Sequence, residues 1–444
     1  MRIWIKTPLA ILAEGCAGGM VVEDGVITEC LVAGAQPGAP CDEVVDASEH
    51  VVLPGLINTH HHFYQTLTRA YGPALDKELF DWLKTLYPVW AGLTPEYLAV
   101  ATRLALAELL LSGCTTAADH HYVFPDGLEE AVDIQAGAAR EMGVRVTLTR
   151  GSMNLSVEDG GLPPVSVVQD SDTILADSAR VIDAFHDAAP GSMVQIALAP
   201  CSPFSVTREV MSDTAVLAAD RNVRLHTHLA ETEDENAFCE ATFGCRPLEY
   251  LEQVGWLNKS VWLAHGIHFT PDEIARLGKA GVGIAHCPGS NMVLASGMCP
   301  AVELERAGSP VGIGVDGSAS EDASNLMQEA RQALQVQRLR YGAASVSHTD
   351  VLRWATAGSA RCLGRDDIGT IAVGKQADIA MFRLDEPRFS GAGDPLAALI
   401  LCGAHRADRV MVGGEWRVVH GTIAGLDIDA LMACHASAAG ELIA

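Results

Sequence analysis

The sequence predicts an α/β protein whose main domain is a (β/α)8 barrel, joined to a smaller β domain that both ends of the chain build together. Three observations lead to this prediction. Eight short apolar segments alternate with helical ones, strand-like segments recur at both termini, and polar residues gather where the eight apolar segments end. The 444 residues hold a barrel of roughly 250 residues and leave room for a second domain.

The two ends of the chain have the pattern of short strands joined by tight turns. The strand-like segments are Arg2–Lys6, Met20–Glu29, Gly369–Phe382 and Arg409–Gly421. Asp24-Gly25, inside the second segment, is the strongest hairpin-turn dipeptide. Because neither end alone has enough strands to bury a face, we expect the ends to pair. Residues 1–54 and 369–444 then form the β domain, with a C-terminal helix, and residues 55–368 form the barrel.

The middle of the chain alternates β-branched apolar segments with helical ones. The eight apolar segments are Val51–His62, Thr115–His121, Val144–Gly151, Met193–Ser202, Val223–Glu231, Val261–His268, Val282–Asn291 and Val311–Gly317. Near-continuous apolar strands separated by helices are typical of a parallel sheet whose outer face is covered. Eight such units favour a closed barrel over an open sheet.

Composition excludes several classes of protein. The net charge of −26 would repel phosphate backbones and anionic membranes, so we expect neither nucleic acid nor a membrane as partner. Charged residues are only 19% and hydrophobic residues 49%, which indicates a large core and excludes intrinsic disorder. The 12 cysteines include no C-x-x-C and are expected to be free thiols. Without a full signal sequence or an apolar run of about 18 residues, we expect a cytoplasmic protein. The apolar surplus favours a homo-oligomer.

Nine of the 16 histidines lie at or just beyond the carboxyl end of a predicted strand. In an α/β barrel that end is the mouth of the active site. A purely solvated surface would scatter histidines, so their convergence indicates a site. The nine are His60, His62, His120, His121, His226, His228, His265, His268 and His286.

The spacing of the polar residues indicates a metal site. His60 and His62 are two residues apart after a strand, so both side chains point to one side and can chelate one ion. Imidazole nitrogen suits Zn²⁺ or Fe²⁺. We choose His228 as a further ligand because Glu231, three residues on, can then reach over a water at the metal. Asp316 follows a run of glycine and β-branched residues and is the last ligand candidate.

Other histidines of the set remain open. His265 lies on a separate strand and is either a ligand or a group that hydrogen-bonds the reacting water or oxyanion. One of His120 and His121 is expected to face the cavity, and the other to face the helices. The members for which a structural role is favoured are His226, His268 and His286.

Three imidazoles and a carboxylate with an open coordination position activate water, lowering its pKa from about 15.7 to about 7. Glu231 can accept the proton of that water and pass it to a leaving amine. The predicted chemistry is therefore hydrolysis at an sp² carbon. The sequence has no P-loop, no G-x-G-x-x-G after a strand and no G-x-S-x-G, so phosphoryl transfer, dinucleotide binding and serine hydrolysis lack support. The missing C-x-x-C excludes the zinc deaminases that depend on it.

These motifs, in this order, resemble those of the amidohydrolase superfamily. The matching stretches are PGLINTHHHFYQ, HLAE, LAHG, GVDGSAS and, near the C-terminus, GTIAVGKQADI. The resemblance covers nearly the whole chain and implies a distorted (β/α)8 barrel with a β-sandwich formed by both termini. It also assigns roles: the metal ligands His60, His62, His228 and Asp316, the proton shuttle Glu231, and His265, which with Asp316 orients the attacking water. The fourth strand lacks the bridging lysine of binuclear members, which implies one metal ion, zinc, with iron as the alternative.

Longer stretches resemble the deaminase branch of the superfamily and imply 8-oxoguanine, an oxidised purine base, as the substrate, with urate and ammonia as products. By this resemblance Gln65 hydrogen-bonds the purine ring. Cys201 stands near the position where guanine deaminases carry an arginine, and this departure fits a pocket reshaped for an extra oxygen. Among the aromatics of Phe63–Thr94, we expect Trp90 rather than Trp82 to wall the pocket, because a flat heterocycle favours stacking.

Two alternatives remain. The substrate could be a related heterocycle: guanine, isoguanine, an s-triazine such as hydroxyatrazine, or S-adenosylhomocysteine. The chain could instead be an inactive binding or assembly protein, but such members usually lose metal ligands and this one keeps all four.

Overall fold

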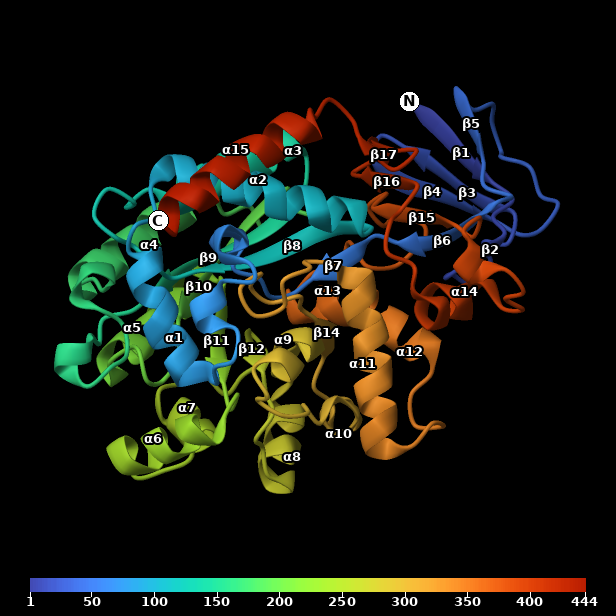
Figure 1. Cartoon of the computed structure of the whole chain (residues 1–444). Coiled ribbons are helices and arrows are strands. Elements are labelled where there is room, and N and C mark those ends of the chain that lie inside the picture. Colours follow the sequence, from blue (N-terminus) through green and yellow to red (C-terminus); the bar gives the residue numbers. More distant parts are fainter.

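A computed structural model describes all 444 residues. Eight parallel strands close into a barrel in the order β10-β11-β12-β13-β14-β7-β8-β9 (Figure 1). The strands are β7 (Leu56–Asn58), β8 (Cys114–His121), β9 (Arg145–Ser152), β10 (Val194–Pro200), β11 (Arg224–Leu229), β12 (Val261–His265), β13 (Gly283–His286) and β14 (Val311–Ile313). Each lies within or overlaps one of the eight predicted segments, so the barrel prediction is confirmed.

The first predicted barrel segment, Val51–His62, proved to be two strands in two different sheets. β6 (His50–Pro54) joins a sheet of the terminal β domain, whereas β7 begins the barrel. Gly55 separates them, and a Cβ at this position would lie 2.1 Å from Oγ1 of Thr115. The apolar pattern cannot distinguish the two strands, because both are fully buried.

Strands from both ends of the chain form the β domain, as predicted. One sheet has the order β4-β3-β1-β5 and the other β18-β17-β16-β15-β6-β2. Figure 1 shows the blue N-terminal strands beside the orange and red C-terminal ones. The strands are β1 (Arg2–Lys6), β2 (Ala10–Ile11), β3 (Gly19–Glu23), β4 (Val26–Leu31), β5 (Glu43–Asp46), β15 (Ile379–Arg383), β16 (Arg409–Val412), β17 (Glu415–Val419) and β18 (Thr422–Ile423). Side chains of both sheets, including Ile3, Met20, Ile379 and Met411, pack into one apolar cluster.

The predicted strand Gly369–Phe382 is a strand only from Ile379 onward. Its glycine-rich first part consists of turns whose backbone bonds the β3–β4 hairpin, as in the 2.9 Å bond from the N–H of Ile27 to the oxygen of Lys375. At the tip of that hairpin Asp24 and Gly25 have φ of 50° and 83°, the left-handed conformation that the Asp-Gly dipeptide predicts.

Helices surround the barrel and bury its outer face in the largest apolar cluster. The longer ones are α1 (Leu79–Trp90), α2 (Pro95–Leu111), α3 (Ala131–Met142), α4 (Ser171–Phe185), α5 (Arg208–Arg221), α6 (Glu233–Phe243), α8 (Pro271–Ala280), α11 (Leu326–Tyr341) and α15 (Ile428–Leu442). The shorter ones are α7 (Pro247–Gln253), α9 (Pro288–Val293), α10 (Ala301–Ala307), α12 (His348–Arg353), α13 (Ser359–Cys362) and α14 (Pro395–Ala398). The 3₁₀ turns are η1 (Phe63–Thr68), η2 (Gly72–Ala74), η3 (Val157–Asp159), η4 (Val165–Val167) and η6 (Pro387–Phe389), and the π turns are η5 (Trp354–Gly358) and η7 (Leu399–Gly403). No helix combines the length and apolar composition needed to cross a membrane.

A buried ion pair joins the barrel to the β domain. Nε and Nη2 of Arg145, on β9, each lie 3.0 Å from a carboxylate oxygen of Asp378, which directly precedes β15. Nη1 of Arg145 donates to the backbone oxygens of Gly191 and Ser192, both at 2.7 Å. Both charged side chains are almost fully buried, so the pair is a fixed point between the two domains.

Candidate active site

The predicted site residues meet at the carboxyl ends of the barrel strands. His60 and His62 follow β7, His228 lies on β11 and Asp316 follows β14. Nε2 of His62 lies 3.2 Å from Nε2 of His228 and 3.3 Å from Oδ1 of Asp316, and Nε2 of His60 lies 3.2 Å from the same Oδ1. All four side chains are buried. Residues that are up to 256 positions apart in the chain therefore converge within hydrogen-bond distance.

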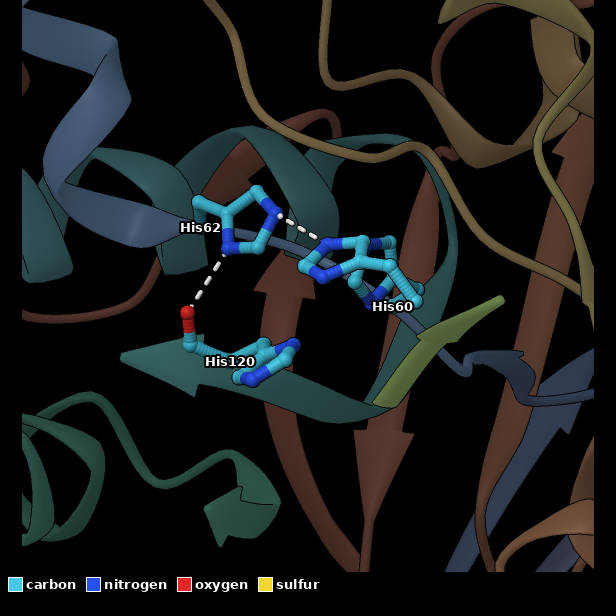
Figure 2. A group of neighbouring side chains, drawn as sticks. His60, His62 and His120 are labelled. Carbon is cyan, nitrogen blue, oxygen red and sulfur yellow. Dashed lines mark hydrogen bonds between the residues drawn. The ribbon is translucent and has the colours of Figure 1, made fainter. Parts of the chain in front are cut away.

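The hydrogen bonds of these histidines place their protons away from the centre. Nδ1 of His62 lies 2.7 Å from the backbone oxygen of His120, and Nδ1 of His228 lies 2.6 Å from that of Cys201. A carbonyl oxygen can only accept, so each Nδ1 carries the proton and each Nε2 keeps a free lone pair. Figure 2 shows the first of these bonds, with His60 and His120 close by.

His60 reaches the same state through His226. Nδ1 of His226 lies 2.8 Å from the backbone oxygen of Trp262, so its Nε2 must accept, and it lies 2.8 Å from Nδ1 of His60. His60 therefore donates through Nδ1 and keeps a free Nε2, which is buried and has no hydrogen-bond partner. His226 thus orients a neighbouring imidazole, in keeping with the structural role that the sequence favoured.

This donor set fits a metal cation. Lone pairs of His60, His62 and His228 face one another and the Asp316 carboxylate with no proton between them, an arrangement that a cation between them would stabilise. Burial, aided by the charge of His265, lowers the pKa of His228 to about 3, so this imidazole is neutral. Burial opposes ionisation of Asp316, yet the neighbouring imidazoles of His60 and His62 hold its pKa well below the usual value. Neutral imidazole and ionised carboxylate are the forms that bind metal.

His120 belongs to the same cluster, and His121 does not. A ligand atom of His120 lies within 4.8 Å of one each from His60, His62 and His228. Its Nε2 donates to the backbone oxygen of Ala199 at 2.9 Å, which leaves Nδ1 buried and without a partner. The ring of His121 instead packs edge-on against Tyr64. The sequence left these two open, and the structure brings His120 to the site.

Glu231 and His265 form a buried acid–base pair beside the metal cluster. Nε2 of His265 lies 3.4 Å from Oε2 of Glu231 and 3.9 Å from Oδ2 of Asp316. Burial raises the pKa of Glu231, although the charge of His265 opposes the rise. Burial lowers the pKa of His265, but the charges of Glu231 and Asp316 outweigh it, so the net shift is upward. Raised pKa values on a carboxyl group and an imidazole in contact suit proton transfer near neutral pH.

Two polar residues that the sequence reasoning missed support this pair. Oδ1 of Asn291, on α9, lies 2.9 Å from Nδ1 of His265, and the hydroxyl of Ser320 donates to Oδ2 of Asp316 at 3.4 Å. Asn291 lies within the predicted segment Val282–Asn291, whose polar end was the available signal. Ser320 follows Asp316 by four residues, on the same loop.

The backbone is in the left-handed region at three non-glycine residues of the site. The φ angles are 54° at Ala230, 68° at His265 and 63° at Asp316. Such conformations are uncommon for residues with a Cβ and cluster at functional sites. They turn the chain sharply at the ends of β11 and β12 and just beyond β14, which brings Glu231, His265 and Asp316 together.

A cavity opens beside these residues. Its lining includes His62, His228, Glu231, His265 and Asp316 and continues through Gln65, Leu79, Trp82, Leu83, Tyr87, Tyr122, Cys201, Phe204, Leu294 and Ser320. Trp90 is absent from the lining, contrary to the prediction: it is fully buried behind the wall and donates to Oγ1 of Thr68 at 3.2 Å. Trp82, about two turns nearer the start of α1, lines the cavity in its place.

Gln65, on η1, and Cys201, directly after β10, both line the cavity. Oε1 of Gln65 is buried and has no hydrogen-bond partner, and a Cβ at position 317 would lie 1.9 Å from it, so Gly317 leaves it room. Sγ of Cys201 lies 3.9 Å from Nδ1 of His228. Burial raises the pKa of the Cys201 thiol to about 12, so it lines the wall as a neutral group. The cavity thus offers the unpaired acceptor of Gln65 among apolar and aromatic side chains.

Comparisons with known proteins agree with this geometry. The model of the amidohydrolase family matches residues 51–417. The chain is 65% identical to an 8-oxoguanine deaminase from Pseudomonas aeruginosa, over 100% of this chain and 99% of that protein. It is 38% identical to a hydroxydechloroatrazine ethylaminohydrolase from a Pseudomonas species, over 87% and 81%. The structure of an atrazine chlorohydrolase from Arthrobacter aurescens complexed with zinc superposes with a TM-score of 0.93, at 31% identity and over 98% of this chain and 100% of that one.

Proposed function

The chain belongs to the amidohydrolase family, and from this premise we propose that it hydrolyses the 2-amino group of 8-oxoguanine to give urate and ammonia. One observation carries the reaction type: three free imidazole Nε2 atoms and the Asp316 carboxylate converge beside the buried Glu231–His265 pair. The substrate rests on the full-length identity to a deaminase of that base, which is far higher than the identity to the triazine-processing relative.

The metal in this proposal is one zinc ion, with iron as the alternative. His60, His62, His228 and Asp316 would hold it, and the structure of a zinc-bound relative supports the choice. When bound, the ion polarises the attacking water and lowers its pKa from about 15.7 to about 7. His120 lies beside these ligands, but its Nε2–H donates to the backbone oxygen of Ala199.

Glu231 moves the proton. Its carboxylate accepts the proton of the water that attacks C2 of the purine, and then transfers it to the departing nitrogen. One C–O bond forms at C2, one C–N bond breaks, and the amino group leaves as ammonia. The raised pKa of Glu231 suits both steps, because the group must accept a proton and release it near neutral pH.

His265 and Asp316 orient the reaction. Nε2 of His265 faces both carboxylates, so a proton on Nε2 can be donated toward the attacking water or the developing oxyanion. Asn291 fixes the ring through Nδ1. Gln65 has a free buried oxygen that can accept from a ring N–H of the base.

The test is a panel of amino-heterocycles assayed for ammonia release: 8-oxoguanine, guanine, isoguanine, hydroxyatrazine and S-adenosylhomocysteine. We expect the highest kcat/KM with 8-oxoguanine, with urate as the product. A higher kcat/KM with guanine or any other member of the panel would overturn the substrate assignment.

Metal dependence is tested on the same protein. Dialysis against a chelator should remove activity, and one equivalent of zinc should restore it. Full activity of metal-free protein would contradict the reaction type, and restoration by Fe²⁺ but not by Zn²⁺ would contradict zinc.

A further inference from the structure

The wall of the cavity that α1 provides is apolar except for one unpaired polar atom. Leu79, Trp82, Leu83 and Tyr87 recur at helical spacing and line the cavity. The indole N–H of Trp82 already donates to the backbone oxygen of Ala319 at 3.1 Å. The hydroxyl of Tyr87 is buried and has no hydrogen-bond partner.

A buried hydroxyl without a partner is costly, and such groups in native proteins call for an explanation. Tyr87 is fully buried, and its ring is held edge-on against Trp90 at 5.8 Å between centroids, so the hydroxyl is rigidly placed. The hydroxyl of Tyr64, which lies nearby, does not bond it either. A ligand in the cavity can supply the missing bond.

The position of Tyr87 indicates which part of a ligand it meets. Tyr122 lies against the metal cluster, with its ring centroid 5.1 Å from that of His62, and Gln65 lies against the loop of Asp316. Tyr87 has no ring contact with any histidine of the cluster and packs against Trp90 instead. A base whose C2 reacts at the cluster extends its second ring away from the cluster, along the cavity that Tyr87 lines.

We infer that the Tyr87 hydroxyl is a specificity-determining group that hydrogen-bonds the edge of the substrate farthest from the reacting carbon. In 8-oxoguanine that edge carries the C8 oxygen and the N7–H, and a phenol can donate to the first or accept from the second. In guanine the edge offers only the N7 acceptor. This inference rests on the proposed function and extends it by naming the residue that reads the oxidised edge.

Tyr87→Phe removes only the hydroxyl. We expect kcat/KM for 8-oxoguanine to fall about 10-fold or more, because a site that hydrogen-bonds its substrate loses discrimination when the bond is removed. The values for guanine should fall less, and those for 2-amino-4-oxopyrimidine, which has the reacting ring alone, should stay unchanged. The preference for 8-oxoguanine over guanine therefore shrinks.

Tyr250→Phe is the matched control. Tyr250, on α7, is also fully buried with an unpaired hydroxyl, but it stacks on Phe243 outside the cavity. We expect its three kcat/KM values to equal those of the wild type, and both variants to keep the wild-type melting temperature within a few degrees.

Two results would overturn the inference: equal loss in Tyr87→Phe with all three substrates, which indicates a structural role, or no loss with any of them. The proposed function fails separately, if the wild-type protein does not deaminate 8-oxoguanine at all.

Discussion

Replacement of Asn291 by alanine tests how the site holds its imidazole. Oδ1 of Asn291 accepts from Nδ1 of His265 at 2.9 Å, and its Nδ2 has no partner. Truncation therefore removes one side-chain hydrogen bond and no other. The backbone N–H of Asn291 bonds the oxygen of Cys287 and does so in the variant as well, so α9 should remain intact.

The size of the effect follows from the charge of the donor. His265 faces two carboxylates and is protonated when it acts, so the lost bond is one to a charged group, worth about 1.5–3 kcal/mol. At about 1.36 kcal/mol per tenfold, kcat/KM should fall about 10- to 150-fold. The bond to Asn291 also helps to raise the pKa of His265, so the limb of the pH–rate profile that reports loss of this proton should move to lower pH.

The assay is kcat/KM for 8-oxoguanine across pH in the wild type, Asn291→Ala and Asn291→Asp. The aspartate keeps an acceptor for Nδ1, so it should recover much of the activity lost in the alanine variant. If the alanine variant is folded and retains kcat/KM within about threefold of the wild type at every pH, the positioning role of Asn291 is refuted.

Three further perturbations have defined outcomes. Glu231→Gln should bind zinc like the wild type yet lose about 10²- to 10⁴-fold in turnover, because it cannot move a proton; near-normal turnover with a full metal complement would contradict the shuttle. Asp378→Ala leaves the Arg145 guanidinium buried without its carboxylate partner, so urea titration should show a free energy of unfolding lower by about 3–5 kcal/mol. A loss below about 1 kcal/mol would argue against the pair as a fixed point between the domains. Burial lowers the pKa of His286 to about 3 from 6.5, so the contribution of the neutral imidazole to the free energy of unfolding is complete above pH 6.5 and is lost as the pH falls toward 3. In His286→Asn the urea midpoint should therefore depend less on pH between 6.5 and 3. Identical curves for the variant and the wild type would contradict this assignment.

Much of the fold could be predicted because the barrel strands have a strong local pattern. Each buried parallel strand is a continuous apolar run, and the polar residues at its end mark the mouth. The division of Val51–His62 between two sheets could not be predicted, because both halves are equally apolar and only tertiary pairing separates them. The same holds for Gly369–Phe382, where long-range bonds to the hairpin replace a strand.

The site residues could be predicted where their spacing in the sequence determines which way the side chains point. They could not be predicted where the packing of a helix determines it. His60 and His62 share a side because strand side chains alternate, and the structure brings them to His228 and Asp316. The choice of Trp90 over Trp82 was not determined by the sequence, because both lie on the buried face of α1 and the angle of that helix to the barrel decides which one reaches the cavity. The homo-oligomer expected from the composition stays a prediction.

The left-handed backbone at Ala230, His265 and Asp316 limits how this protein can be made more stable. Each such residue costs about 1–3 kcal/mol, a large share of a typical total of about 5–15 kcal/mol. Glycine would relieve the strain, but at positions 265 and 316 it would delete the imidazole and the carboxylate. At position 230 it would remove only a methyl group. Thermostabilisation can therefore begin at Ala230, where the substitution leaves the reacting side chains unchanged. Selection for stability alone would favour glycine at positions 265 and 316 as well, and would then abolish activity.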